Sequence, residues 1–220
     1  MCYTIGMLEY TDICFNIDRF LEMCSDEHVT LTLATKTIPQ DMLMRVHERY
    51  PDLIFGENRV QELVDKYFEG PQWIFIGRLQ KNKVKYLVDR VQMICSVDSV
   101  ELAQEIQKRC AKADKLMPVL LELNLGEEQK GGVSKEEIVD LAEAVAQMPN
   151  LQMLGVMTVL PIVGADSAAG TANVVYRLLS SKYHFHYLSM GMSGDYEIAI
   201  KHGGNMLRIG SAVFGERSYK

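Results

Sequence analysis

Short runs of apolar residues alternate along this chain with longer segments in which apolar residues recur every three or four positions. Eight runs have the length and the bulky side chains of buried strands: LTLAT, LIFGE, WIFIG, MICSV, PVLLELNL, QMLGVMT, HYLSM and MLRIG. The segments between them follow the helical period and predict helices at residues 42–50, 60–68, 83–88 and 194–202. Two capping boxes, Ser134 with Glu137 and Asp98 with Glu101, predict the starts of two more helices.

The regular alternation of strands and helices indicates the fold class. Eight strands separated by helices, with no long break in composition, predict an α/β fold: a single (β/α)8 barrel of the TIM type that forms one domain over residues 1–220. An open, doubly wound sheet is the alternative. The G-x-G-x-x-G turn that favours a dinucleotide-binding sheet is absent after the first strand, where residues 35–40 read TKTIPQ.

Lys36 directly follows the first predicted strand. An amine held at the end of a buried strand can lose hydration and charge, and it then becomes a nucleophile toward carbonyl groups. A lysine in this place can equally well extend its ammonium group into solvent. Because the active sites of barrels lie at the C-terminal ends of the strands, we expect a shared polar rim that includes Lys36, Glu57, Asn58, Gly77, Asn124, Met157 and Thr158.

The loops after the last two strands have the chemistry of a phosphate site. The first contains GMSGD (191–195), and the last strand runs into LRIGSAVFG (207–215). Ser193 is expected to cap the helix at 194–202 and to face an anion, while Gly210 and Ser211 permit close approach of backbone N–H groups. Ordinary helix capping by Ser193 and turn formation by the glycines is the alternative reading.

Several motifs together resemble one known family. The chain is similar, from about residue 31 to 219, to the YggS-type pyridoxal phosphate homeostasis proteins, which are related to the N-terminal barrel of alanine racemase. The motifs that carry the resemblance are LATKT with Lys36, FGENRVQE, WIFIGRLQKNK, LNLGEEQKGGV, LSMGMSGDYEIAI and LRIGSAVFGER.

The resemblance implies a cofactor and its contacts. It implies that Lys36 binds pyridoxal 5'-phosphate (PLP) as an internal aldimine, and that Arg208 faces the pyridine nitrogen. The remaining cofactor-binding residues that it implies are Asn58 near the ring, Met192, and Ser193, Gly210 and Ser211 at the phosphate.

This chain departs from the family pattern at several places, among them the region before Val29, which is short for the family. Ile74 stands where histidine is usual, Arg78 replaces proline or histidine, and Gly131 replaces serine or histidine. Residues 162–174 lack the charged start that commonly opens the sixth helix. We expect local variation at that helix and at the edge of the site beside it.

Three functions follow from these observations. The first is a PLP carrier that takes part in intracellular PLP homeostasis, delivers PLP to apoenzymes and turns over no substrate. The second is a weak racemase-like PLP enzyme. An arginine opposite the ring nitrogen makes PLP a weak electron sink, and we expect no additional domain that could supply the second base of a racemase. The third is a cofactor-free aldolase that uses Lys36 against a sugar phosphate.

Composition narrows the range of partners. Lys and Arg total 23 against 29 Asp and Glu, a net charge of -6 that opposes nucleic acid. We expect a cytoplasmic protein without membrane association, because no apolar stretch approaches the roughly 20 residues of a membrane span and no signal peptide precedes the first helix.

No metal site is predicted. The five cysteines have no zinc-like spacing. The pair His184 and His186, expected on the seventh strand, lacks a third ligand. We also expect a monomer.

Overall fold

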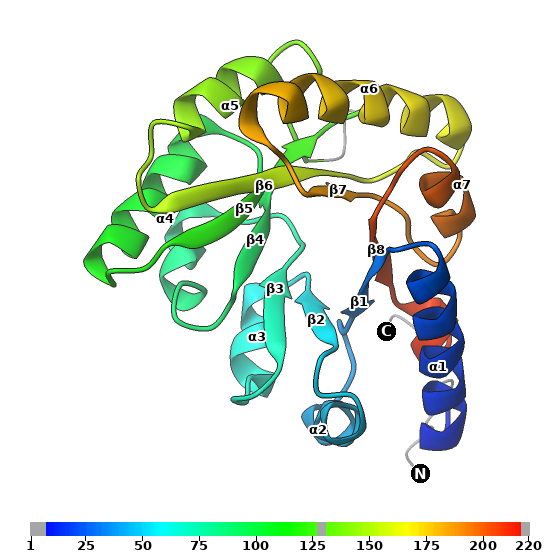
Figure 1. The fold of residues 1–220 in the computed structure, drawn as a ribbon. Coiled ribbons are helices and arrows are strands. Elements are labelled where there is room, and N and C mark those ends of the chain that lie inside the picture. Colours follow the sequence, from blue (N-terminus) through cyan, green and yellow to red (C-terminus); the bar gives the residue numbers. More distant parts are fainter. Residues whose placement is uncertain (1–7, 127–130, 217–220) are drawn as a thin grey trace.

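Eight parallel strands close into a barrel in chain order, with β8 beside β1 (Figure 1). The computed structural model describes residues 8–126 and 131–216. All eight predicted strands form: β1 Thr30–Ala34, β2 Ile54–Glu57, β3 Gln72–Phe75, β4 Met93–Val97, β5 Met117–Leu123, β6 Leu151–Thr158, β7 Tyr187–Ser189 and β8 Met206–Ile209. The prediction of a (β/α)8 barrel is therefore confirmed, and the open sheet is excluded.

Helices surround the barrel on its outside (Figure 1). They are α1 Tyr10–Asp26, α2 Gln40–Arg49, α3 Val60–Lys66, the 3-10 helix η1 Lys81–Tyr86, α4 Val100–Lys112, α5 Ile138–Val145, α6 Ala165–Tyr183, α7 Tyr196–Lys201 and α8 Ser211–Phe214. The helix expected at 83–88 is thus a short 3-10 turn that begins two residues earlier. The helix expected at 194–202 is shorter than predicted, because residues 193–195 form a turn, closed by a hydrogen bond of 3.1 Å from Asp195 N–H to the carbonyl oxygen of Met192.

One of the two predicted capping boxes forms. Ser134 N–H donates to Glu137 Oε2 at 3.0 Å, and Glu137 N–H donates to Ser134 Oγ at 3.3 Å, just before α5 begins. The box at the start of α4 was assigned one residue too early. Ser99 is the N-cap there, with its Oγ accepting from Leu102 N–H at 3.4 Å, while Asp98 accepts from the Ser99 hydroxyl.

Strand residues alternate between two apolar layers. Trp73 and Phe75 point outward into the layer between strands and helices, where both are fully buried, as expected. The barrel interior is filled by Ala34, Ile74, Ile76, Met93, Cys95, Leu120, Met157 and Met206. Ile74, one of the departures from the family pattern, is therefore an interior packing residue. Above this layer the same inward faces carry Arg208 on β8 and Glu122 on β5.

The sixth helix begins without a side-chain cap. Its N-cap is Gly164 in the left-handed region (φ 80°), and Ile162 and Val163 just before it are 99% and 87% exposed. The variation expected for residues 162–174 relative to the family stays a prediction. At the other end of α6, His184 is the C-cap, and β7 begins only at Tyr187, so the placement of His184 and His186 on the seventh strand was wrong.

Among the helices of the described ranges, none combines the length and the apolar character that crossing a bilayer requires.

Candidate functional site

A cavity of about 480 Å³ opens at the C-terminal end of the barrel, within the size range of small-molecule sites. All seven residues predicted to bind the cofactor line it: Lys36, Asn58, Met192, Ser193, Arg208, Gly210 and Ser211. The other lining residues are Ala34, Ile76, Val159, Gly194 and Glu216. The barrel brings these residues together because parallel strands end at the same rim, and the lining comes from the ends of β1, β2, β3, β6, β7 and β8.

Lys36 is half-buried on a tight turn that follows β1. Ile38 N–H donates to the carbonyl oxygen of Thr35 at 3.0 Å and closes this turn. Thr37 inside it has a φ of 66°, a conformation that is rare for a β-branched residue. The backbone beside the candidate nucleophile is therefore strained, a feature that clusters at functional sites.

Five of the seven residues predicted for the polar rim do not line the cavity: Glu57, Gly77, Asn124, Met157 and Thr158. Glu57 is fully buried and pairs with Lys66 on α3 instead of lining the cavity. The Thr158 hydroxyl donates to the carbonyl oxygen of Leu123 at 2.8 Å, between strands β6 and β5. Fewer of the predicted polar rim residues therefore line the cavity than the sequence led us to expect. The cationic side chains among the lining residues are Lys36 and Arg208.

Arg208 is a buried cation, 5% exposed, whose guanidinium group is fixed by two hydrogen bonds. Its Nη1 donates to Ser189 Oγ and its Nη2 donates to the carbonyl oxygen of Thr158, both at 2.8 Å. Burial lowers the pKa of Arg208, because the charged form loses hydration. The planar guanidinium still carries further N–H donors, so it can offer a hydrogen bond to a group in the cavity.

Ser193 joins the two loops predicted to hold a phosphate. Its Oγ accepts from Gly210 N–H at 3.2 Å and from Ala212 N–H at 3.0 Å. The expected cap of its own helix was wrong: Asp195 is the N-cap of α7, and its carboxylate accepts from Met192 N–H at 2.5 Å. Ser193 Oγ instead accepts hydrogen bonds from backbone N–H groups at the start of α8. N–H groups in such a position can also donate to the oxygen atoms of an anion.

Ser193→Ala is expected to lower the free energy of unfolding by about 1 kcal/mol, because two backbone N–H groups lose their acceptor. Urea denaturation measures the change. Ser167→Ala, at an exposed position on α6, is the matched control and should alter stability far less. An equal stability of the Ser193→Ala and wild-type proteins would show that water replaces the hydroxyl at no cost.

Gly77 leaves no room for a side chain beside Asn58. A Cβ atom built on Gly77 would lie 2.0 Å from the carbonyl oxygen of Asn58. Gly77→Ala is therefore expected to shift Asn58 at the cavity wall and to cost about 3 kcal/mol of stability, as overpacking does. Thermal and urea denaturation test this. Gly170→Ala on α6 is the control, since its Cβ would meet only His202 at 3.6 Å, and a similar loss in both variants would refute the argument.

Glu122 is a buried carboxyl group in the barrel interior. It is 8% exposed, and its Oε2 has no hydrogen-bond partner within the described part of the chain. Burial raises its pKa to about 7, with a further rise from Asp98, while the charges of Arg208 and Arg78 lower it. The departures at Arg78 and Gly131 thus both face this group, since a Cβ on Gly131 would lie 3.1 Å from Glu122 Oε1.

Sequence reasoning missed the apolar walls of the cavity. Ile76 and Val159 directly follow β3 and β6, so their positions at strand ends were the available signal. It also missed Ser189 and the Thr158 carbonyl as the partners of Arg208. Those contacts join separate strands, and a pairing of this kind leaves no local pattern in the sequence.

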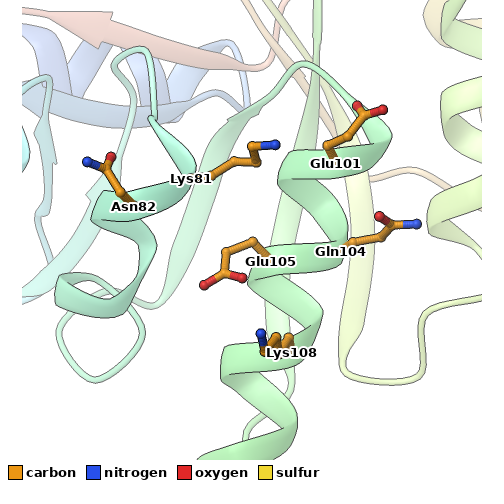
Figure 2. Close-up of a pocket in the computed structure, with 6 residues that line it drawn as sticks. All are labelled: Lys81, Asn82, Glu101, Gln104, Glu105 and Lys108. Atoms are coloured by element: carbon orange, nitrogen blue, oxygen red, sulfur yellow. The ribbon is translucent and has the colours of Figure 1, made fainter.

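A second hollow of about 510 Å³ lies between η1 and α4 (Figure 2). Lys81 reaches from η1 toward α4, and Glu105 reaches back toward η1, while Asn82 and Gln104 point away (Figure 2). Its lining residues are exposed apart from the half-buried Glu105. It therefore lacks the buried, fixed polar groups that distinguish the Lys36 cavity.

No three His, Cys, Asp or Glu side chains gather in a metal-binding arrangement within residues 8–126 and 131–216. Cys14, Cys24, Cys95 and Cys110 are buried and free of disulfide bonds, and Cys2 lies outside the described residues. Burial raises the pKa of the Cys95 thiol to about 12, so this interior sulfur stays protonated.

Known proteins resemble the chain over most of its length. The family described as alanine racemase, N-terminal domain, matches residues 3–218. The pyridoxal phosphate homeostasis protein of Aquifex aeolicus is 41% identical over 197 residues, covering 84% of this chain and 86% of its own. The protein of that name from Vibrio cholerae is 36% identical over 208 residues, covering 87% and 86%. PipY of Synechococcus elongatus PCC7942, solved with PLP bound, has the same fold, with a TM-score of 0.78 at 24% identity, covering 92% of this chain and 100% of PipY.

Proposed function

Because this chain belongs to the family of pyridoxal phosphate homeostasis proteins, built on the alanine racemase N-terminal domain, we propose that it binds PLP in the Lys36 cavity and takes part in PLP homeostasis. The observation that carries the proposal is the joint presence in one cavity of an amine, a buried guanidinium and two loops that contribute serine and glycine residues. PLP presents an aldehyde, a pyridine nitrogen and a phosphate, and each of these groups has a chemical counterpart there.

The residues present fit the cofactor. Lys36 supplies the amine for the aldehyde. The hydroxyl groups of Ser193 and Ser211 would serve the phosphate, and the Ser193 oxygen accepts from the N–H groups of Gly210 and Ala212, which fixes this hydroxyl beside Gly210. Arg208 would supply a donor for the ring nitrogen, and Asn58 and Met192 would contribute to holding the ring.

PLP, when bound, supplies an electron sink for amino-acid chemistry. Arg208, a charged donor held by Ser189 and Thr158, would weaken that electron sink, since it would favour a ring nitrogen without a proton. The ionisable groups among the described lining residues are Lys36, Arg208 and the exposed Glu216. This set supports binding and release of PLP without substrate turnover.

The setting of this function is part of the proposal. We infer that the protein works in the cytoplasm, which agrees with four buried cysteines that form no disulfide bond. We also infer that it acts as a monomer that releases PLP to apoenzymes of PLP-dependent enzymes. Light scattering tests the monomer directly, and the exposed Val174 and Leu178 on α6 are an apolar surface that a dimer would cover.

The test is a titration of the purified protein with PLP, followed by visible absorption. The proposal expects a saturable yellow band in the wild type and in Lys85→Ala, a control at an exposed lysine, and no such band in Lys36→Ala. The loaded protein should then activate an apoenzyme and leave the enantiomers of alanine unchanged. Absence of the band in the wild type would refute PLP binding through Lys36, and racemisation of alanine would refute the carrier role.

A further inference from the structure

Charged side chains of α3 that do not line the cavity form hydrogen bonds with the backbone of the turn that carries Lys36. Lys66 Nζ donates to the carbonyl oxygen of Thr35 at 2.6 Å, and Thr37 N–H donates to Glu62 Oε2 at 2.7 Å. The peptide groups on both sides of Lys36 are thereby fixed by α3. A weaker contact of 3.5 Å joins Lys66 Nζ to the carbonyl oxygen of Ile38, at the end of the same turn.

A buried ion pair anchors this arrangement. Lys66 Nζ lies 2.5 Å from Glu57 Oε1, and the two side chains are 9% and 0% exposed. The Thr35 hydroxyl donates to the same Glu57 oxygen at 2.8 Å, and Asn58 N–H donates to the other at 3.0 Å. Apolar residues could fill this volume without the cost of burying charge. The ion pair fixes the orientation of the backbone, because Lys66 donates to the carbonyl oxygen of Thr35 and Glu57 accepts from Asn58 N–H.

Thr37 shows that the turn is held against its own preference. Its φ of 66° is unfavourable for a β-branched residue, and such a conformation persists only where the surroundings fix it. Glu62 provides the fixing contact, from a side chain that is 25% exposed and lies 3.8 Å from Lys66 Nζ. Loss of that contact would let the turn relax and let Lys36 move with it.

We propose that Glu57, Glu62 and Lys66 are positioning residues that aim Lys36 Nζ into the cavity and so set how fast it bonds to an aldehyde. This inference rests on the proposed function, because it describes how the same site is prepared for PLP. In that reaction the lysine nitrogen bonds to the aldehyde carbon, and the aldehyde oxygen leaves as water with the two protons of the amine. The contribution of the three residues is geometric, since none of them lines the cavity.

Glu62 gives the sharpest test, because it is partly exposed and can be changed without leaving a buried charge unpaired. Glu62→Ala removes the acceptor for Thr37 N–H, whereas Glu62→Gln keeps a carbonyl oxygen in its place. We expect the visible band to form about tenfold more slowly on mixing Glu62→Ala with PLP, as misplacement of a reacting group does. Glu62→Gln should restore a rate close to wild type. Asp65→Ala, at an exposed acidic residue on the same helix, is the matched control and should not change the rate.

A second measurement needs no PLP. Reductive methylation of Lys36 by formaldehyde and cyanoborohydride, followed by peptide mass spectrometry, should show the same order of the variants. Thr37→Gly, which accepts a positive φ at no steric cost, should recover most of the rate when combined with Glu62→Ala. Equal rates in the wild type and Glu62→Ala, or equal losses in Glu62→Ala and Glu62→Gln, would overturn the positioning role. If the wild type itself gave no band with PLP, the proposed function would fail instead, and the methylation rates would still decide the positioning role.

Discussion

Glu122→Gln is expected to stabilise the apoprotein by about 3 kcal/mol at pH 8 and to change its stability little near pH 4. The folded protein keeps a proton on Glu122 up to a pKa of about 7, because burial disfavours the anion, whereas an exposed glutamate has an ordinary value of 4.5. The native state therefore binds more protons than the unfolded chain between these values. Its stability falls as the pH rises from about 4.5 to about 7, and the neutral amide of glutamine removes this loss.

The measurement is urea denaturation of both proteins across this pH range. Glu48→Gln, at an exposed position on α2, is the matched control and should show no gain that grows with pH. The groups that face Glu122 are Asp98 and Cys95 on the β4 side, Arg208 on β8 and Arg78 after β3. A difference between wild type and Glu122→Gln that stays constant from pH 4 to pH 8 would contradict the account of a buried carboxyl that holds its proton.

Arg208→Gln is expected to lower the free energy of unfolding by about 3 kcal/mol at pH 7. The guanidinium donates to the carbonyl oxygen of Thr158 and to the hydroxyl of Ser189, and both acceptors lie in a buried region that the shorter amide does not reach in the same geometry. Hydrogen bonds from a charged donor are stronger than neutral ones, so each contributes more than an average bond.

Three comparisons separate the contribution of the hydrogen bonds from that of the charge. Arg208→Lys keeps a cation but loses the planar pair of donors, so its loss should lie between those of wild type and Arg208→Gln. Arg177→Gln, at an exposed position on α6, should be nearly neutral. In a Glu122→Gln background at pH 8, Arg208→Gln should cost less, because the arginine then has no carboxylate to stabilise. Equal losses in the buried and exposed arginine variants would contradict this picture.

The strands and several residues that line the Lys36 cavity could be predicted from the sequence, because each occupies a position that a local sequence pattern marks. The strands are continuous apolar runs, and Lys36, Asn58 and Arg208 lie at or near strand ends, which a parallel barrel brings to one rim. Helix boundaries were less accurate, since short helices such as η1 are decided by packing more than by the helical period.

Contacts between distant segments were beyond the reach of sequence patterns. Ser193 was expected to cap the helix next to it, but the barrel brings the N–H groups of Gly210 and Ala212 within reach of its hydroxyl. Lys66 occurs in a polar segment of a short helix, and its sequence context suggests exposure, yet it is buried against Glu57. Glu122 interrupts an apolar run, and only the alternation of the strand places it inside the barrel.

The most direct test of the central claim is borohydride reduction of the PLP-loaded protein followed by peptide mapping. Borohydride reduces the C=N bond between a lysine and the aldehyde carbon of PLP to a stable single bond. Mass spectrometry then identifies the modified residue. The account predicts that the visible band disappears on reduction and that the pyridoxyl group is found on Lys36 at close to one per chain. A label spread over exposed lysines such as Lys81 and Lys85, with Lys36 unmodified, would contradict the assignment of this cavity as the PLP site.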